Sequence, residues 1–119
     1  HKILGDDSIS ITPTAVRVPV YRSHSESVYV ETEETITPDE ARELLAAAPG
    51  LIIQDDPHNN VYPMPLFTSD TDEVYVGRIR RDLGCDKALN MWITFDQIRK
   101  GAATNAVQIA EELLRQGLI

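Results

Sequence analysis

The chain has 119 residues, of which 42% are hydrophobic and 25% are charged, and this is the composition of a globular domain with one core. Its formal net charge is -8 and its pI is about 4.7, which argues against nucleic acid or an anionic membrane as a partner, since both need a concentrated basic surface. Its apolar runs are too short to span a membrane.

The first part of the chain predicts two neighbouring strands. Residues 9–21 alternate apolar and polar side chains and are rich in β-branched residues, a pattern typical of a strand. Pro13 and Pro19 cannot donate to a sheet ladder, so we expect parts of this strand at an edge or a bulge. Residues 27–34 predict a second strand. The short RSHSE segment between them lets the two strands lie side by side.

A helix is predicted over residues 37–50. Thr37 is suited to the N-cap, Pro38 to the first helical position, and Glu40 completes a Thr-x-x-Glu capping box. An apolar stripe follows at helical spacing, and the Pro49-Gly50 pair ends it.

The rest of the chain predicts three more strands, a loop and a second helix. The strands are expected over residues 51–54, 73–82 and 88–95. Three prolines and two asparagines predict a loop over residues 55–65. From Asp96 onward the apolar spacing becomes helical, and Gly117 stands where that helix would end. This order predicts an α+β fold with a mostly antiparallel or mixed sheet and helices on one face.

Arg17 and His24 are the first candidate functional residues. A guanidinium on a strand can bind a carboxylate through two parallel hydrogen bonds, although a lone strand arginine more often forms an exposed cross-strand ion pair. The imidazole of His24 is suited to acid–base catalysis near neutral pH, although most loop histidines are simply solvated. Taken singly, neither residue decides between the two interpretations.

A basic cluster and a loop histidine offer weaker signals. Arg78, Arg80 and Arg81 form the one basic cluster of the chain, which is typical of an anion site or, more often, of a solvated strand face. His58 follows two aspartates in a loop, but this spacing matches no standard metal-ligand pattern. We therefore predict no metal site.

The single cysteine, Cys85, excludes an internal disulfide and favours a reducing compartment, so we expect a cytoplasmic protein. It lies in a loop sequence that shows neither a neighbouring base nor a feature that would lower its thiol pKa. We therefore interpret it as an ordinary loop thiol rather than a nucleophile.

Three stretches in a fixed order, "VRVPVYRSHSESV", "VGRIRRD" and "RKGAATNAVQIAEELL", resemble the C-terminal half of the aspartate-β-semialdehyde dehydrogenase family. The resemblance covers nearly all of the chain. It implies that residues 1–119 form a substrate-binding and dimerisation domain. Its terminal helix would pack toward an NADP-binding Rossmann domain that is not in this sequence. We therefore expect a fold like the semialdehyde dehydrogenase dimerisation domain, and a homodimer or higher oligomer.

Enzymes of this family interconvert aspartate semialdehyde and aspartyl phosphate, using NADP and phosphate, on the route to lysine, threonine and methionine. A cysteine thiolate attacks the aldehyde, hydride passes to the nicotinamide, and phosphate then cleaves the thioester. By resemblance, Arg17 would bind the substrate carboxylate, His24 would be the acid–base catalyst, and Gln97 would contact the nicotinamide cofactor.

The sequence also departs from the family pattern. This sequence has no counterpart of the family's catalytic cysteine, glycine-rich nucleotide turn or phosphate-binding lysine. We do not assign the role of the lysine to Lys2, and we do not assign the role of the cysteine to Cys85. The chain begins at His1 without a methionine, so we expect it to be part of a longer protein and to be inactive alone. The alternative is a stand-alone, non-catalytic α+β dimerisation or binding module.

Overall fold

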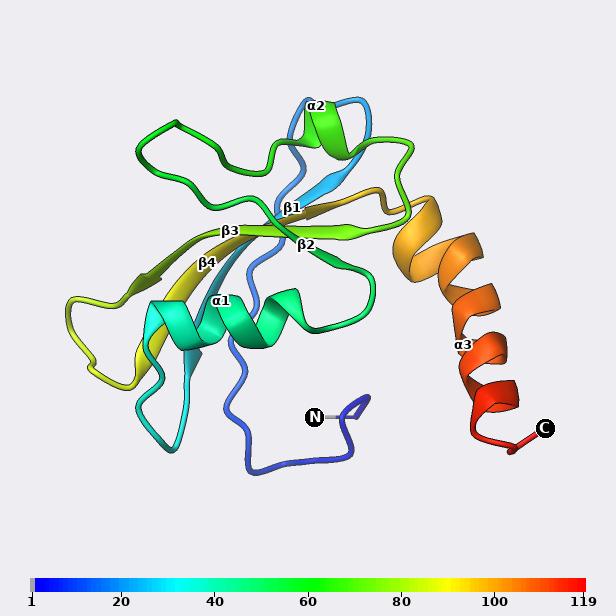
Figure 1. The fold of residues 1–119 in the computed structure, drawn as a ribbon. Helices are drawn as coiled ribbons and strands as arrows, with labels where there is room; N and C mark the ends of the chain where they lie inside the picture. The colour runs from blue at the N-terminus through cyan, green and yellow to red at the C-terminus, as the bar shows by residue number, and fades with distance from the viewer. Residues whose placement is uncertain (1) are drawn as a thin grey trace.

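The computed structural model describes residues 2–119 and has one four-stranded mixed sheet (Figure 1). Its strand order is β1-β4-β3-β2. The strands are β1 (His24–Glu31), β2 (Leu51–Ile53), β3 (Val74–Arg81) and β4 (Ala88–Phe95). β4 is antiparallel to both β1 and β3, whereas β2 is parallel to β3. The predicted α+β fold with a mostly antiparallel or mixed sheet is confirmed.

Helix α1 (Pro38–Ala46) covers one face of the sheet, as Figure 1 shows. The predicted capping box is confirmed: the Thr37 hydroxyl accepts from the Glu40 amide at 3.2 Å, and the Glu40 carboxylate accepts from the Thr37 amide at 2.8 Å. Beneath the helix, the core is formed by four buried apolar side chains, Ala41, Val76, Ile79 and Leu89. The cap therefore fixes the start of the one helix that closes this core.

The loop between β2 and β3 covers part of the other face. Within it, Pro63 is buried, and its carbonyl accepts from the Trp92 indole at 3.2 Å. A Cβ added to Gly77 would lie 2.0 Å from the Gln54 carbonyl oxygen and 2.6 Å from Pro63, so only glycine allows the loop to approach β3 this closely. The loop also contains a short helix, α2 (Pro65–Thr68), which the sequence analysis did not predict.

The prediction of a strand over residues 9–21 is wrong. This segment is extended but pairs with no strand in the described part of the chain, and all of its residues are exposed. Val16, for example, is 78% exposed. Pro13 and Pro19 lack the N–H groups that a ladder requires. The second strand begins earlier than predicted, at His24 rather than Ser27, because His24 pairs with Phe95.

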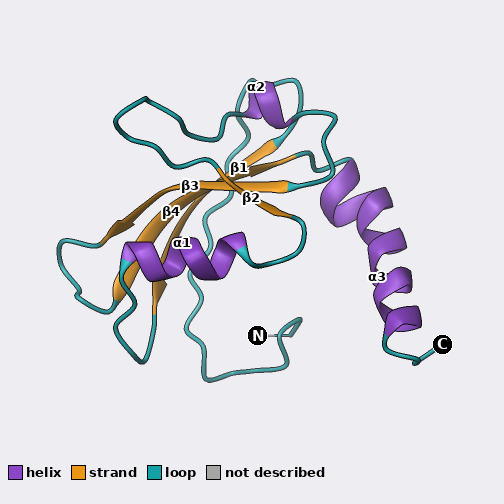
Figure 2. Cartoon of the chain, in the orientation of Figure 1, coloured by secondary structure: helices purple, strands orange, loops and turns teal. Residues whose placement is uncertain are grey.

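The C-terminal helix begins later than predicted. Between Asp96 and helix α3 (Thr104–Arg115) lies an irregular turn, η1 (Arg99–Ala103), in which Gly101 has a φ of 86°. The expected end at Gly117 is confirmed, because its amide donates to Leu114 and the next amide donates to Leu113, which closes a Schellman motif. Figure 2 shows α3 projecting beyond the sheet.

The apolar side chains of α3 are largely uncovered. Val107, Ile109 and Leu114 are all more than half exposed. That this helix packs toward a nucleotide-binding domain stays a prediction. Among residues 2–119, no helix is both long enough and apolar enough to cross a bilayer.

A buried ion pair joins α1 to an irregularity in β3. The register of β3 against β4 shifts between Gly77 and Arg80. The Asp55 carboxylate, only 2% exposed, accepts from the amides of Arg78 at 2.6 Å and Ile79 at 3.2 Å. Arg42 of α1 donates its Nε to the same carboxylate at 2.8 Å and an Nη to the Ile79 carbonyl at 2.8 Å. One carboxylate therefore satisfies the amides that the shifted register leaves free.

Replacing Asp55 is expected to destabilise the protein strongly. Asp55→Ala removes the buried partner of Arg42 and the shared acceptor of two backbone amides. Breaking a buried pair in this way costs about 3–5 kcal/mol. Asp39→Ala is the matched control, because Asp39 is the exposed partner of the same arginine, with a side chain 90% exposed, and surface ion pairs contribute little. Urea denaturation of the full-length protein that carries this chain measures both changes. Equal losses in the two variants would contradict the assigned role of Asp55.

A second prediction concerns the close approach at Gly77. Gly77→Ala places a methyl group against the Gln54 backbone, and such overpacking costs about 1–3 kcal/mol or more when backbone must move. Gly84→Ala is the control, because its added Cβ would meet only the Asp82 carboxylate, at 3.4 Å. Thermal unfolding should show a clearly lower midpoint for Gly77→Ala alone. A midpoint like that of the parent protein would refute the packing argument.

Candidate functional site at one end of the sheet

His24 is the first residue of β1 and lies where β4 ends. It pairs across the sheet with Phe95, and the two rings form an edge-to-face contact with centroids 5.7 Å apart and planes at 80°. By the alternation along β1, His24 shares the face of Val28 and Val30, which is the face that carries α1. The histidine itself is exposed. The strand pairing therefore positions an imidazole that remains accessible to a reacting group.

The turn before His24 is held by buried polar contacts. Ser23 is 3% exposed, has a left-handed φ of 74°, and places its hydroxyl 3.0 Å from the Ser69 hydroxyl. The neighbouring Arg22 forms ion pairs with Asp70 at 2.6 Å and with Asp96 at 2.8 Å. A left-handed φ is costly for a residue other than glycine, so these contacts must sustain it. They fix where β1 begins.

Asp96 is the fully buried centre of these contacts. Its carboxylate accepts from the amides of Asp70 at 2.8 Å and Ile98 at 2.9 Å, in addition to its ion pair with Arg22. Burial alone would raise the pKa of this carboxyl, but the two amide hydrogen bonds and the Arg22 charge outweigh it and hold the pKa below its usual value. Asp96 is therefore a carboxylate that joins three segments of the chain.

Gln97 directly follows Asp96 at the same end of the sheet. Its Oε1 atom is buried and has no hydrogen-bond partner in the described structure. Buried side-chain oxygens nearly always have a partner, so this atom is available to accept a hydrogen bond from a bound group. The structure thus brings two of the predicted site residues, His24 and Gln97, to one end of the sheet.

Arg17, the third predicted residue, lies in the exposed extended segment. Within residues 2–119, no hydrogen bond or ion pair joins it to His24 or Gln97. Cys85 lies in the turn between β3 and β4, at the end of the sheet opposite His24, and is half-buried. Its distance from the imidazole agrees with its interpretation as an ordinary thiol.

Sequence reasoning missed the charged residues that support this end of the fold. Besides Arg22 and Asp96, Arg99 makes a two-bond contact with Asp72 at 2.6 and 2.9 Å, and Thr104 donates to the same carboxylate at 2.9 Å. These bonds hold the Asp72 pKa below its usual value. Asp72 thereby fixes the turn before α3. In the sequence, these residues are visible only as charged or small polar residues near the ends of strands. Which of them form contacts with one another cannot be predicted from the sequence.

Comparisons with known proteins identify the family of the chain. The family model described as semialdehyde dehydrogenase, dimerisation domain, matches residues 1–100. The chain is 56% identical over 119 residues to the aspartate-semialdehyde dehydrogenase of Aquifex aeolicus and 52% identical over 120 residues to that of Legionella pneumophila, covering 100% of this chain and 35% of each relative.

Solved structures of aspartate semialdehyde dehydrogenases have a fold similar to that of this chain. The aspartate semialdehyde dehydrogenase II of Vibrio cholerae, complexed with ASA, superposes with a TM-score of 0.88 at 41% identity, over 96% of this chain and 33% of that one. The chain thus spans about a third of the length of the relatives it matches. With the family model covering most of its residues, the chain belongs to the semialdehyde dehydrogenase family and corresponds to its dimerisation domain.

Proposed function

We propose that the chain is the C-terminal part of an aspartate-semialdehyde dehydrogenase. The whole enzyme would interconvert L-aspartate 4-semialdehyde, phosphate and NADP with L-4-aspartyl phosphate and NADPH, in the biosynthesis of lysine, threonine and methionine in the cytoplasm. The observation that carries this proposal is the 56% identity to an aspartate-semialdehyde dehydrogenase along the whole chain. The alternative, a stand-alone binding module, gains no support from the Aquifex aeolicus and Legionella pneumophila relatives, which are each about three times as long.

In this proposal His24 is the acid–base catalyst. Its ring is oriented by the Phe95 edge contact and is otherwise exposed, so another domain can bring a cysteine thiol to it. The imidazole would take the proton of that thiol as the sulfur attacks the aldehyde carbon, and would return a proton to the oxygen of the resulting thiohemiacetal. The buried contacts of Arg22 and Asp96 would hold the imidazole in place while this happens.

Arg17 would bind the substrate carboxylate. Its exposed position in an extended segment leaves the planar guanidinium free to present two parallel N–H groups. The substrate would then lie between this segment and His24. The prolines on either side of Arg17, Pro13 and Pro19, limit the backbone freedom of the segment before the substrate binds.

Gln97 would contact the nicotinamide cofactor. Its buried Oε1 lacks a partner and suits an amide N–H donor, such as the carboxamide of a nicotinamide ring. The residues present therefore fit the cofactor, which would supply the hydride acceptor when bound. Most of the cofactor's contacts would come from the remainder of the enzyme, because the chain has no glycine-rich nucleotide turn.

The family description also supports a homo-oligomer. The segment of residues 9–21 and helix α3 both expose apolar side chains, including Val16 at 78% and Leu114 at 62%. Surfaces of this kind are typical of contacts with another domain or subunit. We propose a homodimer or a higher homo-oligomer.

Replacing the proposed catalyst tests the function directly. His24→Asn in the full-length enzyme should lower kcat by about a hundred- to ten-thousand-fold, the contribution of a positioned acid–base group. His58→Asn is the matched control, because His58 is also an exposed histidine but lies in the β2–β3 loop. Steady-state assay of NADPH formation, with circular dichroism to verify folding, measures the effect. Unchanged turnover in His24→Asn would refute the assigned role.

A separate test addresses substrate binding. Arg17→Lys keeps the charge but loses the two-bond geometry, so KM for aspartate semialdehyde should rise by about tenfold or more, with a smaller effect on kcat. Arg81→Lys is the control, because Arg81 is an exposed arginine on β3 that faces only Asp86, at 3.7 Å. If KM were the same in the parent and the Arg17→Lys enzyme, the carboxylate would have to be bound elsewhere.

A further inference from the structure

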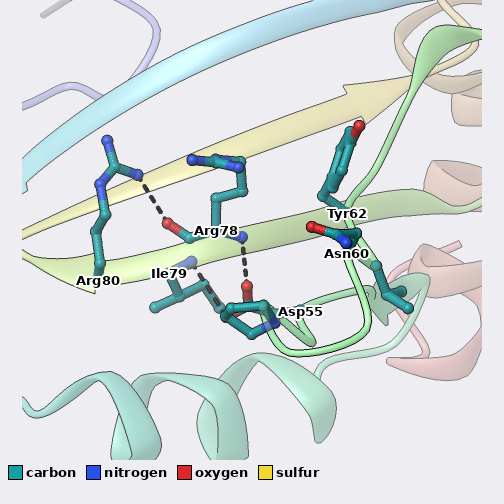
Figure 3. Close-up of a pocket in the computed structure, with 8 residues that line it drawn as sticks. Asp55, Asn60, Tyr62, Arg78, Ile79 and Arg80 are labelled. Carbon is teal, nitrogen blue, oxygen red and sulfur yellow. Dashed lines mark hydrogen bonds between the residues drawn. The ribbon is translucent and has the colours of Figure 1, made fainter.

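A hollow lies between β3 and the loop that follows β2, away from His24. It has a volume of about 240 Å³. Figure 3 shows the residues that form most of its wall, Asp55, Asn60, Tyr62, Arg78, Ile79 and Arg80. Asn90, the partner of Arg80 across the sheet, is five residues along β4 from Phe95, a separation of roughly 17 Å in an extended strand. The hollow and the imidazole therefore occupy different parts of the sheet.

The backbone at this hollow adopts a costly conformation. Arg78 has a left-handed φ of 52° at the point where the register of β3 shifts, and this region is unfavourable for a residue with a side chain. The buried Asp55 carboxylate stabilises it by accepting from the Arg78 and Ile79 amides. As Figure 3 shows, the Arg78, Arg80 and Tyr62 side chains extend to the same side of β3. Backbone strain held in place by a buried charge often marks a binding site.

The two arginines present positive charge at the hollow, and Asp82 interacts electrostatically with Arg80 without a direct ion pair. The Arg78 guanidinium lies 6.0 Å from the centre of the Tyr62 ring, and Arg80 donates to the Arg78 carbonyl at 2.8 Å. Among residues 2–119, neither guanidinium forms an ion pair within 4.0 Å of a carboxylate. The Asp55 carboxylate is already used by Arg42 and the backbone. Two neighbouring arginines without a direct ion pair among the described residues are unexpected in a chain of net charge -8.

We propose that this hollow binds a small oxyanion of the phosphate or carboxylate class. The guanidinium of arginine offers paired N–H donors that match the oxygens of such an anion. Tyr62 and Asn60 also line the hollow, and their side chains carry further hydrogen-bond donors. The volume is below the roughly 300–1,000 Å³ of clefts that take drug-sized ligands, so the occupant is a small ion or metabolite.

The first test uses site-resolved chemical modification. The full-length enzyme is treated with phenylglyoxal, which modifies accessible arginines, with and without inorganic phosphate, and the products are mapped by mass spectrometry. Phosphate should protect Arg78 and Arg80 but leave the reactivity of Arg81 unchanged, because Arg81 is paired with Asp86 instead. Parallel runs with succinate distinguish a carboxylate from a phosphate ligand. Equal modification of Arg78 and Arg80 with and without both anions overturns the proposal.

The second test uses matched variants. Arg78→Gln/Arg80→Gln should weaken phosphate or succinate binding at this site by about tenfold or more, measured by calorimetry, whereas Arg81→Gln should leave it unchanged. Because neither arginine has a role in the proposed reaction, kcat and the KM for phosphate should stay at parent values. This separates the result from that of His24→Asn. If the double variant instead changes only the oligomeric state in light scattering, the arginines bind a second subunit, and the proposal is wrong.

Discussion

The ion pair between Arg42 and Asp55 is the constraint on which the rest of the fold depends. It joins α1 to β3 across the core, and the same Asp55 carboxylate accepts the two amides that the register shift leaves free. Without this carboxylate, α1 would lose its polar anchor, and the amides of Arg78 and Ile79 would lose their acceptor beside an apolar core. The shift in turn makes Arg78 and Ile79 depart from the simple alternation of a strand, with Ile79 in the core and Arg78 outside it.

Asp96 has a similar role directly after the end of β4. It too is a buried carboxylate that accepts backbone amides and contacts one arginine, here Arg22. In both places, irregular backbone is held by charge rather than by apolar packing. This matters because charge-assisted hydrogen bonds specify direction, whereas apolar contacts do not. The residues beside these carboxylates, His24 and Gln97 in one case and Arg78 in the other, are consequently oriented without being buried in the apolar core.

The regular elements could be predicted from the sequence because each has a local cause. The cap at Thr37, the alternation of 88–95 and the stop at Gly117 all act within a few residues. The strand predicted over residues 9–21 was wrong because alternation describes a shape, and a strand also needs a neighbour. The ion pairs of Asp55 and Asp96 could not be predicted, since each joins residues 13 to 74 positions apart. The roles of His24 and Gln97 were proposed from resemblance, and the structure adds their place at one end of the sheet, the Phe95 contact of His24 and the unpartnered Oε1 of Gln97.

The exposure of His24 and Arg17 bears on how their proposed chemistry would work. Where an acid–base group is exposed, water competes with it for the proton that it transfers. The attraction between a carboxylate and a solvated arginine is also weak, because water screens the charges. His24 and Arg17 are both exposed in this chain, so their proposed chemistry gains strength only when another surface excludes water around them. The uncovered apolar side chains of residues 9–21 surround Arg17 in the sequence and directly precede the turn before His24. Contacts that bury these side chains would also exclude water around the proposed site, so the proposed chemistry would depend on assembly.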